Sequence, residues 1–246
     1  MKRLNMQTIK TLPLLAAVTA MTLLAGNPAF AGDEGNPQIL PPSFSAVYSE
    51  LSVAHWKWTY SIPAENHPLL QDGKVDLSQD QPSGPIWFLG GSFAAVPDNN
   101  GGYVATANRI GTVPDDKALF FPILDAECSV AEGNGAKYVQ LRDCAISDID
   151  PAAGLACVID GKPVKHLEQY RFQSRLFVWG PLPANNLLGF AAGTVSPAVS
   201  DGYFLLLYPL SPGKHTIHFT GGVPGFTLDI TYHLTVVKSS PEKRGK

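Results

Sequence analysis

Charged and polar side chains interrupt the apolar segments of this chain at three places. Asp125 and Glu127 directly follow the run ALFFPIL, and Asp201 precedes the run GYFLLLY. Arg171 and Ser174 lie within a stretch of alternating apolar residues. A carboxylate or guanidinium beside an apolar core must be paired or hydrogen-bonded, because an isolated buried charge is strongly destabilising. The pattern therefore favours a structural ion pair that joins Arg171 to either Glu127 or Asp201.

A second interpretation of the same residues is a polar pocket at one end of the fold, which binds a sugar or a calcium ion. Trp56 joins the candidates, because Trp58 lies on the apolar face of the same predicted helix and Trp56 does not; packing of Trp56 under a loop is the alternative. Two of the carboxylates could also act as the acid and base of a glycosidase, if about 5–10 Å separates them. The candidate ligand-binding residues are Trp56, Asp125, Glu127, Arg171, Ser174 and Asp201.

Other catalytic and metal-binding patterns are absent from the sequence. It contains no G-x-S-x-G nucleophile motif, no H-E-x-x-H zinc motif and no glycine-rich phosphate loop. His215 and His218 are three residues apart, so on a regular strand they point to opposite faces and do not chelate one ion. We therefore expect no metal site and no cofactor, calcium being the one ion that the acidic residues leave open.

The first 31 residues have the layout of a secretory signal peptide. Lys2, Arg3 and Lys10 make a positive start, and an apolar run of about fourteen residues follows, too short to span a bilayer comfortably. Ala29-Phe30-Ala31 supplies the small-x-small pattern that precedes cleavage. We expect a mature chain from Gly32 that is secreted or periplasmic and has no membrane anchor after cleavage.

The mature chain would hold 215 residues with 15 basic and 21 acidic side chains. This balance gives no electrostatic reason to bind nucleic acid or an anionic membrane. Residues 32–42 are proline-rich and predict a flexible lead-in, 43–238 predict a single domain, and 239–246 predict a disordered tail.

Three cysteines remain in an exported chain, where two normally form a disulfide. Cys128 and Cys144 flank a glycine-rich loop and a short helical segment, so we predict that they pair. Cys157 lies among apolar residues and is expected to be a buried thiol.

The periodicity of the apolar residues predicts two helices and a series of strands. A helix is expected from the N-cap Ser43 to Ile62, and a second over 136–149. Pro122 predicts an edge position or a bulge within its strand, and Asp160-Gly161 predicts a tight hairpin turn. The fold class is therefore mainly β: a single antiparallel β-sandwich, with a jelly roll among the allowed arrangements, and two short helices. The expected strands cover 85–90, 103–107, 118–124, 155–159, 169–179, 202–208, 214–220 and 226–236.

Several segments together resemble an uncharacterised family of secreted prokaryotic β-rich proteins. The resemblance implies secretion and a β-rich fold, and it transfers no catalytic residue. Similar sequences often carry a cysteine at the position of Gly111, directly before the T-V-P segment of this chain. The matching segments are GPIWFLG at 84–90, TVP at 112–114 with KALFFPI at 117–123, VIDGKPV at 158–164, SDGY at 200–203 and LSPGKHTIHF at 210–219.

The leading functional prediction is an exported, non-catalytic β-sandwich that acts by ligand binding or by assembly at the cell surface, with a carbohydrate or another surface component as partner. The alternative is a carbohydrate-active enzyme, a lyase or glycosidase with paired carboxylates. A third hypothesis is a structural filament or matrix subunit, for which an exposed edge strand or the lead-in would pair with a neighbouring chain.

Overall fold

The computed structural model describes residues 37–239 of the chain. The chain divides into two units, residues 1–31 and 32–246. The predicted signal peptide and residues 240–246 of the predicted tail lie outside the described residues. Within residues 37–239, no helix is long and apolar enough to cross a membrane.

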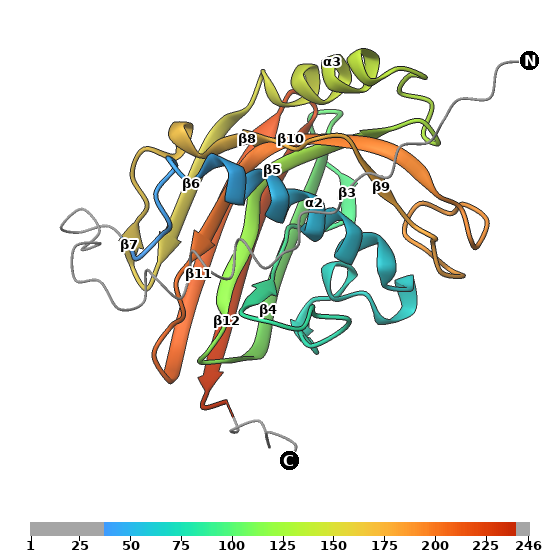
Figure 1. Ribbon diagram of the computed structural model, residues 1–246. Coiled ribbons are helices and arrows are strands. Elements are labelled where there is room, and N and C mark those ends of the chain that lie inside the picture. The colour runs from blue at the N-terminus through green and yellow to red at the C-terminus, as the bar shows by residue number, and fades with distance from the viewer. Residues whose placement is uncertain (1–36, 240–246) are drawn as a thin grey trace, which may run out of the picture. The chain divides into compact units, whose positions relative to one another are not determined.

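Two β-sheets make up most of the described structure (Figure 1). The central sheet has the strand order β2-β5-β10-β8, with β9 also paired to β10. Its strands are β2 (Ile86–Phe88), β5 (Ala118–Ser129), β8 (Arg171–Gln173), β9 (Phe177–Trp179) and β10 (Ser196–Leu207). The outer sheet has the order β1-β4-β12-β11-β6-β7, with β3 paired to β4. Its strands are β1 (Gly73–Lys74), β3 (Ala95–Pro97), β4 (Tyr103–Pro114), β6 (Ala153–Ile159), β7 (Lys162–Pro163), β11 (Gly213–Val223) and β12 (Phe226–Val237).

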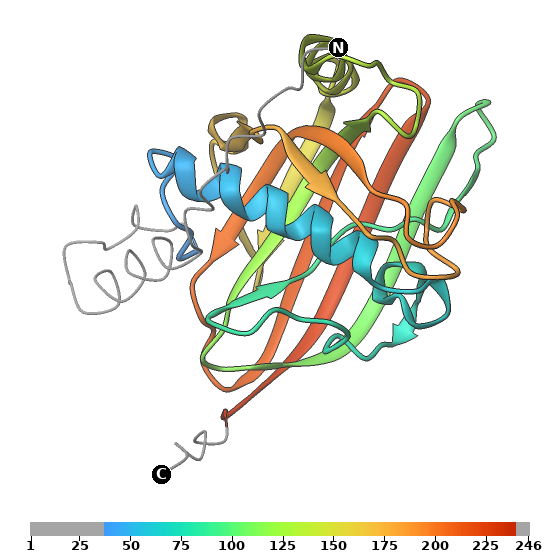
Figure 2. The same ribbon diagram turned by 45° about the vertical axis from the view of Figure 1, so that its right-hand side comes forward.

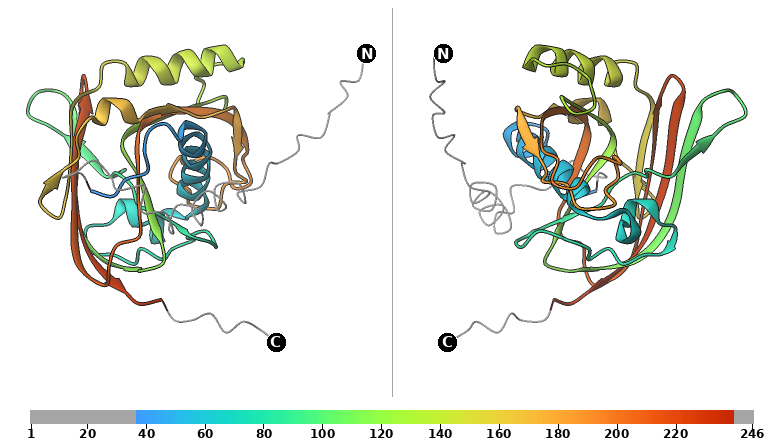
Figure 3. Two further views of the ribbon diagram at one scale, coloured as in Figure 1. Left: turned by 60° about the vertical axis from the view of Figure 1, so that its left-hand side comes forward. Right: turned by 90° about the vertical axis from the view of Figure 1, so that its right-hand side faces the viewer.

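The central sheet is covered on both faces, which explains why β5 and β10 are almost continuously apolar. Phe121 of β5 stacks on Phe219 of the outer sheet at 5.5 Å between ring centroids. The preceding residue, Phe120, points the other way, toward Tyr48 of helix α2 (Ser45–Ser61). Figure 3 shows the resulting layers of outer sheet, central sheet and α2, with helix α3 (Tyr138–Ile149) across one end. Sandwich architecture, as predicted, is confirmed.

The sheets are mixed rather than purely antiparallel, which corrects one detail of the expected fold. β4 runs parallel to β12 along its whole length, and β2 runs parallel to β5. The chain passes from β4 to β5 in the other sheet, so β4 pairs with a strand distant in sequence. Two strands must be antiparallel only where a tight hairpin joins them directly, so strands distant in sequence can pair in parallel.

Two local predictions, a bulge at Pro122 and a turn at Asp160-Gly161, are confirmed. The bulge expected at Pro122 is present, because Phe204 pairs with Pro122 while Tyr203 pairs with Leu124, which leaves Ile123 without a partner in this pairing. The turn at Asp160-Gly161 joins β6 to β7, and both residues have the positive φ of a tight hairpin.

Other local predictions were wrong. Phe44, not Ser43, is the N-cap of helix α2. The predicted strand 169–179 is divided into a 3₁₀ turn, η4 (Leu167–Tyr170), and the short strands β8 and β9. Short 3₁₀ turns also follow α2, namely η2 (Ala64–Asn66) and η3 (Pro68–Leu70).

The lead-in was predicted to be flexible, but its described part is attached to the central sheet. Ile39 forms a bridge with Leu207, and the amide of Leu40 donates to Leu206. The Tyr48 hydroxyl of α2 donates to the Leu40 carbonyl at 2.6 Å. Apolar side chains explain the difference, since Leu40 is buried.

Candidate functional site

A cavity of about 250 Å³ lies between α2 and β5. Helix α2 contributes His55, Trp56 and Thr59 to its wall, and β5 contributes Asp125. The loop after β2 contributes Phe93, and the beginning of β12 closes the cavity with two apolar side chains. We call this space the α2–β5 cavity; Figure 2 shows α2 lying across the strands of the central sheet.

The helical period brings the polar residues of α2 to the cavity. His55 and Thr59 are four residues apart and so lie on one face of the helix. The Nε2 atom of His55 lies 2.8 Å from the Leu89 carbonyl, which can only accept, so Nε2 carries the proton. Burial lowers the pKa of His55 to about 4. The ring is therefore neutral at pH 7, and its Nδ1 atom is a hydrogen-bond acceptor.

Asp125 reaches the cavity because of the bulge in β5. Pro122 and Asp125 are three residues apart and would lie on opposite faces of a regular strand, but the extra residue between them places both against the cavity. Gly202 lies opposite Asp125 in β10, where an added Cβ would lie 2.4 Å from the Asp125 Cβ. Burial alone raises the pKa of Asp125 to about 7.

Four residues of this wall each carry a buried polar atom that has no hydrogen-bond partner within residues 37–239. These atoms are Nδ1 of His55, Nε1 of Trp56, Oγ1 of Thr59 and Oδ2 of Asp125. His55, Trp56 and Thr59 are at most 6% exposed. Most buried polar groups in proteins have a partner, so four such atoms on residues that line one cavity favour a site that a ligand or water completes.

A buried arginine holds the loop that borders the cavity. Arg109 of β4 is fully buried, and its guanidinium donates to the carbonyls of Leu69, Gln71, Gly90 and Gly91. It also donates to the Tyr232 hydroxyl at 2.7 Å, and that hydroxyl donates to Gly90. These bonds fix the backbone immediately before Phe93.

Glu127 lies on the same face of β5 as Asp125 but belongs to a separate cluster. Its carboxyl accepts hydrogen bonds from the Tyr60 hydroxyl at 3.0 Å and from the Trp179 indole at 2.9 Å. Burial is the main cause that raises the pKa of Glu127 well above its ordinary value, and the neighbouring Glu132 is the second cause. Glu127 is therefore protonated at neutral pH, and it does not line the α2–β5 cavity.

The predicted ion pair forms between Arg171 and Asp201. Two hydrogen bonds of 3.0 Å join the guanidinium to the fully buried carboxylate of Asp201, and Asp150 is a second, exposed partner of Arg171 at 2.8 Å. The Ser174 hydroxyl bonds to the backbone nearby, since it accepts a hydrogen bond from the Ser200 amide at 2.7 Å. Arg171, Ser174 and Asp201 thus lie in a structural network outside the α2–β5 cavity.

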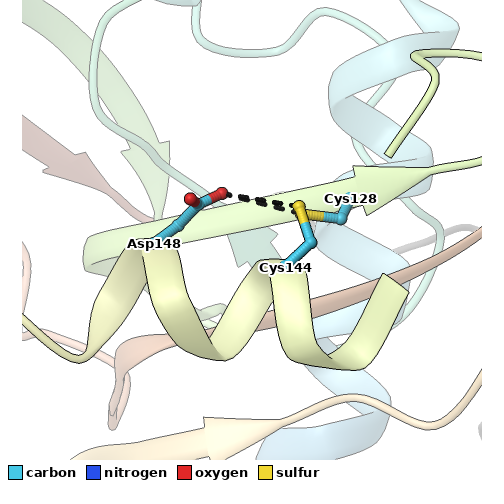
Figure 4. A group of neighbouring side chains, drawn as sticks. All are labelled: Cys128, Cys144 and Asp148. Atoms are coloured by element: carbon cyan, nitrogen blue, oxygen red, sulfur yellow. Dashed lines mark hydrogen bonds between the residues drawn. A yellow bond between two sulfur atoms is a disulfide. The ribbon is translucent and has the colours of Figure 1, made fainter. Parts of the chain in front are cut away.

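The disulfide is confirmed between Cys128 and Cys144, and Cys157 is a buried free thiol. Figure 4 shows Asp148 beside the bridge, with Oδ2 at 3.6 Å from one sulfur and 3.8 Å from the other. Burial raises the pKa of Asp148 above its ordinary value. The bond between the sulfurs leaves no thiolate to bind a metal.

Two of the six predicted ligand-binding residues, Trp56 and Asp125, thus line the α2–β5 cavity. Trp56 is buried rather than exposed and packs with Tyr60 and Trp179. His55 and Thr59 were not among the predicted site residues, although their i, i+4 spacing beside Trp56 was a usable signal. A calcium ion, which the sequence left open, fits the cavity poorly. Its lining side chains supply one carboxyl and few hydroxyls, whereas calcium takes about 6–8 oxygen ligands.

Comparison with known proteins identifies no relative: no protein-family model, curated protein or solved structure matches this chain. The site is therefore interpreted from its own geometry.

Proposed function

We propose that this protein binds a small polar organic molecule of about monosaccharide size in the α2–β5 cavity. The observation that carries the proposal is that four residues lining one cavity each carry a buried polar atom with no hydrogen-bond partner in the part of the chain that the structure describes. Such groups lose their hydrogen bonds to bulk water on folding, and a ligand that bonds to them recovers that free energy.

The cavity volume and its lining favour a carbohydrate-like ligand. About 250 Å³ equals roughly eight water molecules at about 30 Å³ each. Hydroxyl groups donate and accept hydrogen bonds, so a polyol can satisfy both the indole N–H of Trp56 and the acceptor Nδ1 of His55. The rings of Trp56 and Phe93 provide apolar surface for the carbon atoms of such a ligand.

Binding is better supported than hydrolysis by paired carboxylates. Asp125 lines the cavity alone, while Tyr60 and Trp179 occupy the carboxyl of Glu127. A glycosidase needs both carboxyls beside the same glycosidic bond.

We also propose that the protein acts outside the cytoplasm. The signal-peptide pattern of residues 1–31 and the disulfide between Cys128 and Cys144 support this placement, because disulfides persist mainly in oxidising compartments.

Thermal unfolding of the mature protein with a panel of monosaccharides, and separately with calcium and with EDTA, tests the proposed function. A ligand that binds only the folded state raises the unfolding midpoint in proportion to the logarithm of its concentration. We expect one or more sugars to produce such a shift, and neither calcium nor EDTA to do so.

The variant Thr59→Val assigns the shift to the cavity. The Thr59 hydroxyl has no partner in the described structure, so its removal should leave the stability of the unliganded protein unchanged or slightly higher. The ligand-induced shift should fall in this variant and persist in the control Thr106→Val, which lies on β4 outside the cavity wall. An equal shift in wild type and Thr59→Val would contradict binding at this site.

A further inference from the structure

We propose that the ligand of the α2–β5 cavity carries a protonated amine beside a hydroxyl group, as an amino sugar does. This inference rests on the proposed function, since it specifies the chemistry of the molecule in the same cavity. It comes from the balance of donors, acceptors and charges on the cavity wall.

Asp125 has no opposite charge beside it in the part of the chain that the structure describes. Neither lysine nor arginine lines the cavity, and Asp125 forms no ion pair within residues 37–239. Arg109 is the cation of the adjoining loop, but its guanidinium donates to backbone carbonyls and to Tyr232. A buried carboxylate without a partner is costly, and a cationic ligand removes that cost.

The acceptors of the wall match the donors of an ammonium group. Oδ2 of Asp125, Nδ1 of the neutral His55 and Oγ1 of Thr59 are three acceptors that have no hydrogen-bond partner among residues 37–239. An ammonium group has three donors and no acceptor. The Trp56 indole remains as a donor and requires an acceptor, which a hydroxyl or ring oxygen on the same ligand supplies.

Aromatic rings strengthen the preference for a cation. Trp56, Phe93 and Phe226 all line the cavity. The negative faces of aromatic rings attract ammonium groups. An anionic ligand would instead meet the carboxylate of Asp125 with no basic side chain to compensate.

The neighbouring titratable groups leave Asp125 as the group that changes charge near neutral pH. His55 from α2 is neutral above about pH 4, and burial raises the pKa of Tyr60 on the same helix. Burial and Glu132 keep the neighbouring Glu127 protonated. A cationic ligand therefore favours ionised Asp125, and its binding at pH 7 releases protons from the half-protonated carboxyl.

Isothermal titration calorimetry at pH 7 tests this inference with matched probes. Glucosamine is compared with glucose, and the smaller ethanolamine with ethylene glycol, on the mature disulfide-bonded protein. We expect at least one amine to bind at least tenfold more tightly than its neutral counterpart. Titration in two buffers of different ionisation enthalpy should show proton release on amine binding.

Asp125→Asn has nearly the same shape and lacks the charge, so it should reduce the preference for the amine to about onefold and abolish proton release. Thr59→Val is a second variant, and it should weaken amine binding with Asp125 intact. Equal or tighter binding of the neutral probe would overturn the amine inference and leave the proposed function standing. Absence of binding by both members of both pairs would overturn the inference, and failure of the wider monosaccharide panel as well would overturn the proposed function.

Discussion

Two arginines of this protein use their guanidinium groups in different ways. Arg109 is fully buried and bonds to backbone carbonyls, whereas Arg171 is partly exposed and pairs with Asp201 and Asp150. Both hold backbone segments in place, and neither lines the α2–β5 cavity. The cationic side chains therefore organise the scaffold, and Asp125 is the ionisable carboxyl of the cavity.

Loss of Arg171 should be far more damaging than loss of its exposed partner. Arg171→Ala leaves the fully buried carboxylate of Asp201 with Gln173 as its remaining side-chain donor, and should destabilise the fold by about 3–5 kcal/mol. Asp150→Asn removes a partner whose side chain is 61% exposed and should cost less than about 1 kcal/mol. Urea unfolding measures both; a similar loss in the two variants would contradict the buried pair as the stabilising one.

Individual residues differ in how far the sequence predicts their roles. The Arg171–Asp201 pair could be predicted, because both charges interrupt apolar strands and each needs a partner. The α2–β5 cavity could not, because it depends on the bulge that turns Asp125 toward α2 and on the direction in which the helix crosses the sheet. Those features arise from packing between segments about seventy residues apart.

At the scale of the elements, the Tyr232 hydroxyl and Arg109 hold the loop after β2 to the outer sheet. Tyr232→Phe removes a group that accepts from the Gly90 amide and from Arg109 and donates to the Gly90 carbonyl. We expect destabilisation by about 1–3 kcal/mol and faster hydrogen exchange at the Gly90 amide. Tyr138→Phe, at a half-exposed tyrosine of α3, is the control. Unchanged exchange at Gly90 in Tyr232→Phe would contradict this role.

The disulfide is one of the links that attach helix α3 to β5. The bridge spans 16 residues of sequence, and the chain-entropy relation gives a contribution of about 3 kcal/mol. Cys128→Ser with Cys144→Ser should lower the free energy of unfolding by about 2–4 kcal/mol. Dithiothreitol should destabilise the wild type by a similar amount and leave the double variant unchanged. If the double variant is as stable as the oxidised wild type, the apolar contacts of α3 and the hydrogen bonds of Arg142 to backbone carbonyls are sufficient to hold the helix.

Individual strands were easier to predict from the sequence than the strands with which they pair. Strict alternation over 226–236 predicts a strand with one buried face, and β12 has that face. The parallel pairing of β4 with β12 joins residues more than a hundred positions apart, and no local pattern encodes it. The segment 169–179 alternates like a strand, yet tertiary contacts divide it into η4, β8 and β9.

The pH dependence of stability is a property of the whole molecule, because groups with shifted pKa values act in opposite directions. The raised pKa of Asp125, to about 7, stabilises the folded state at low pH, and this contribution is lost as pH rises from about 4 through 7. Glu127 acts in the same direction and extends the loss to higher pH. The pKa values of His55 and His67 are lowered to about 4, so their contribution is lost as pH falls below about 6.5.

The free energy of unfolding of the unliganded protein should therefore vary little between about pH 4.5 and 6.5, because the two carboxyls and the two histidines act in opposite directions there. It should decline from about pH 6.5 toward 9, where only the carboxyls of these four groups still titrate. Each group contributes a slope of at most about 1.4 kcal/mol per pH unit while it titrates. Urea unfolding from pH 4.5 to 9 measures the curve. Asp125→Asn should reduce the slope between pH 6.5 and 7, and Glu127→Gln the slope above it, because the amides do not titrate. A bound cationic amine should also reduce the loss in wild type by stabilising ionised Asp125, and not in Asp125→Asn. A wild-type stability that rises between pH 6.5 and 9 would contradict the burial of both carboxyls in their protonated forms.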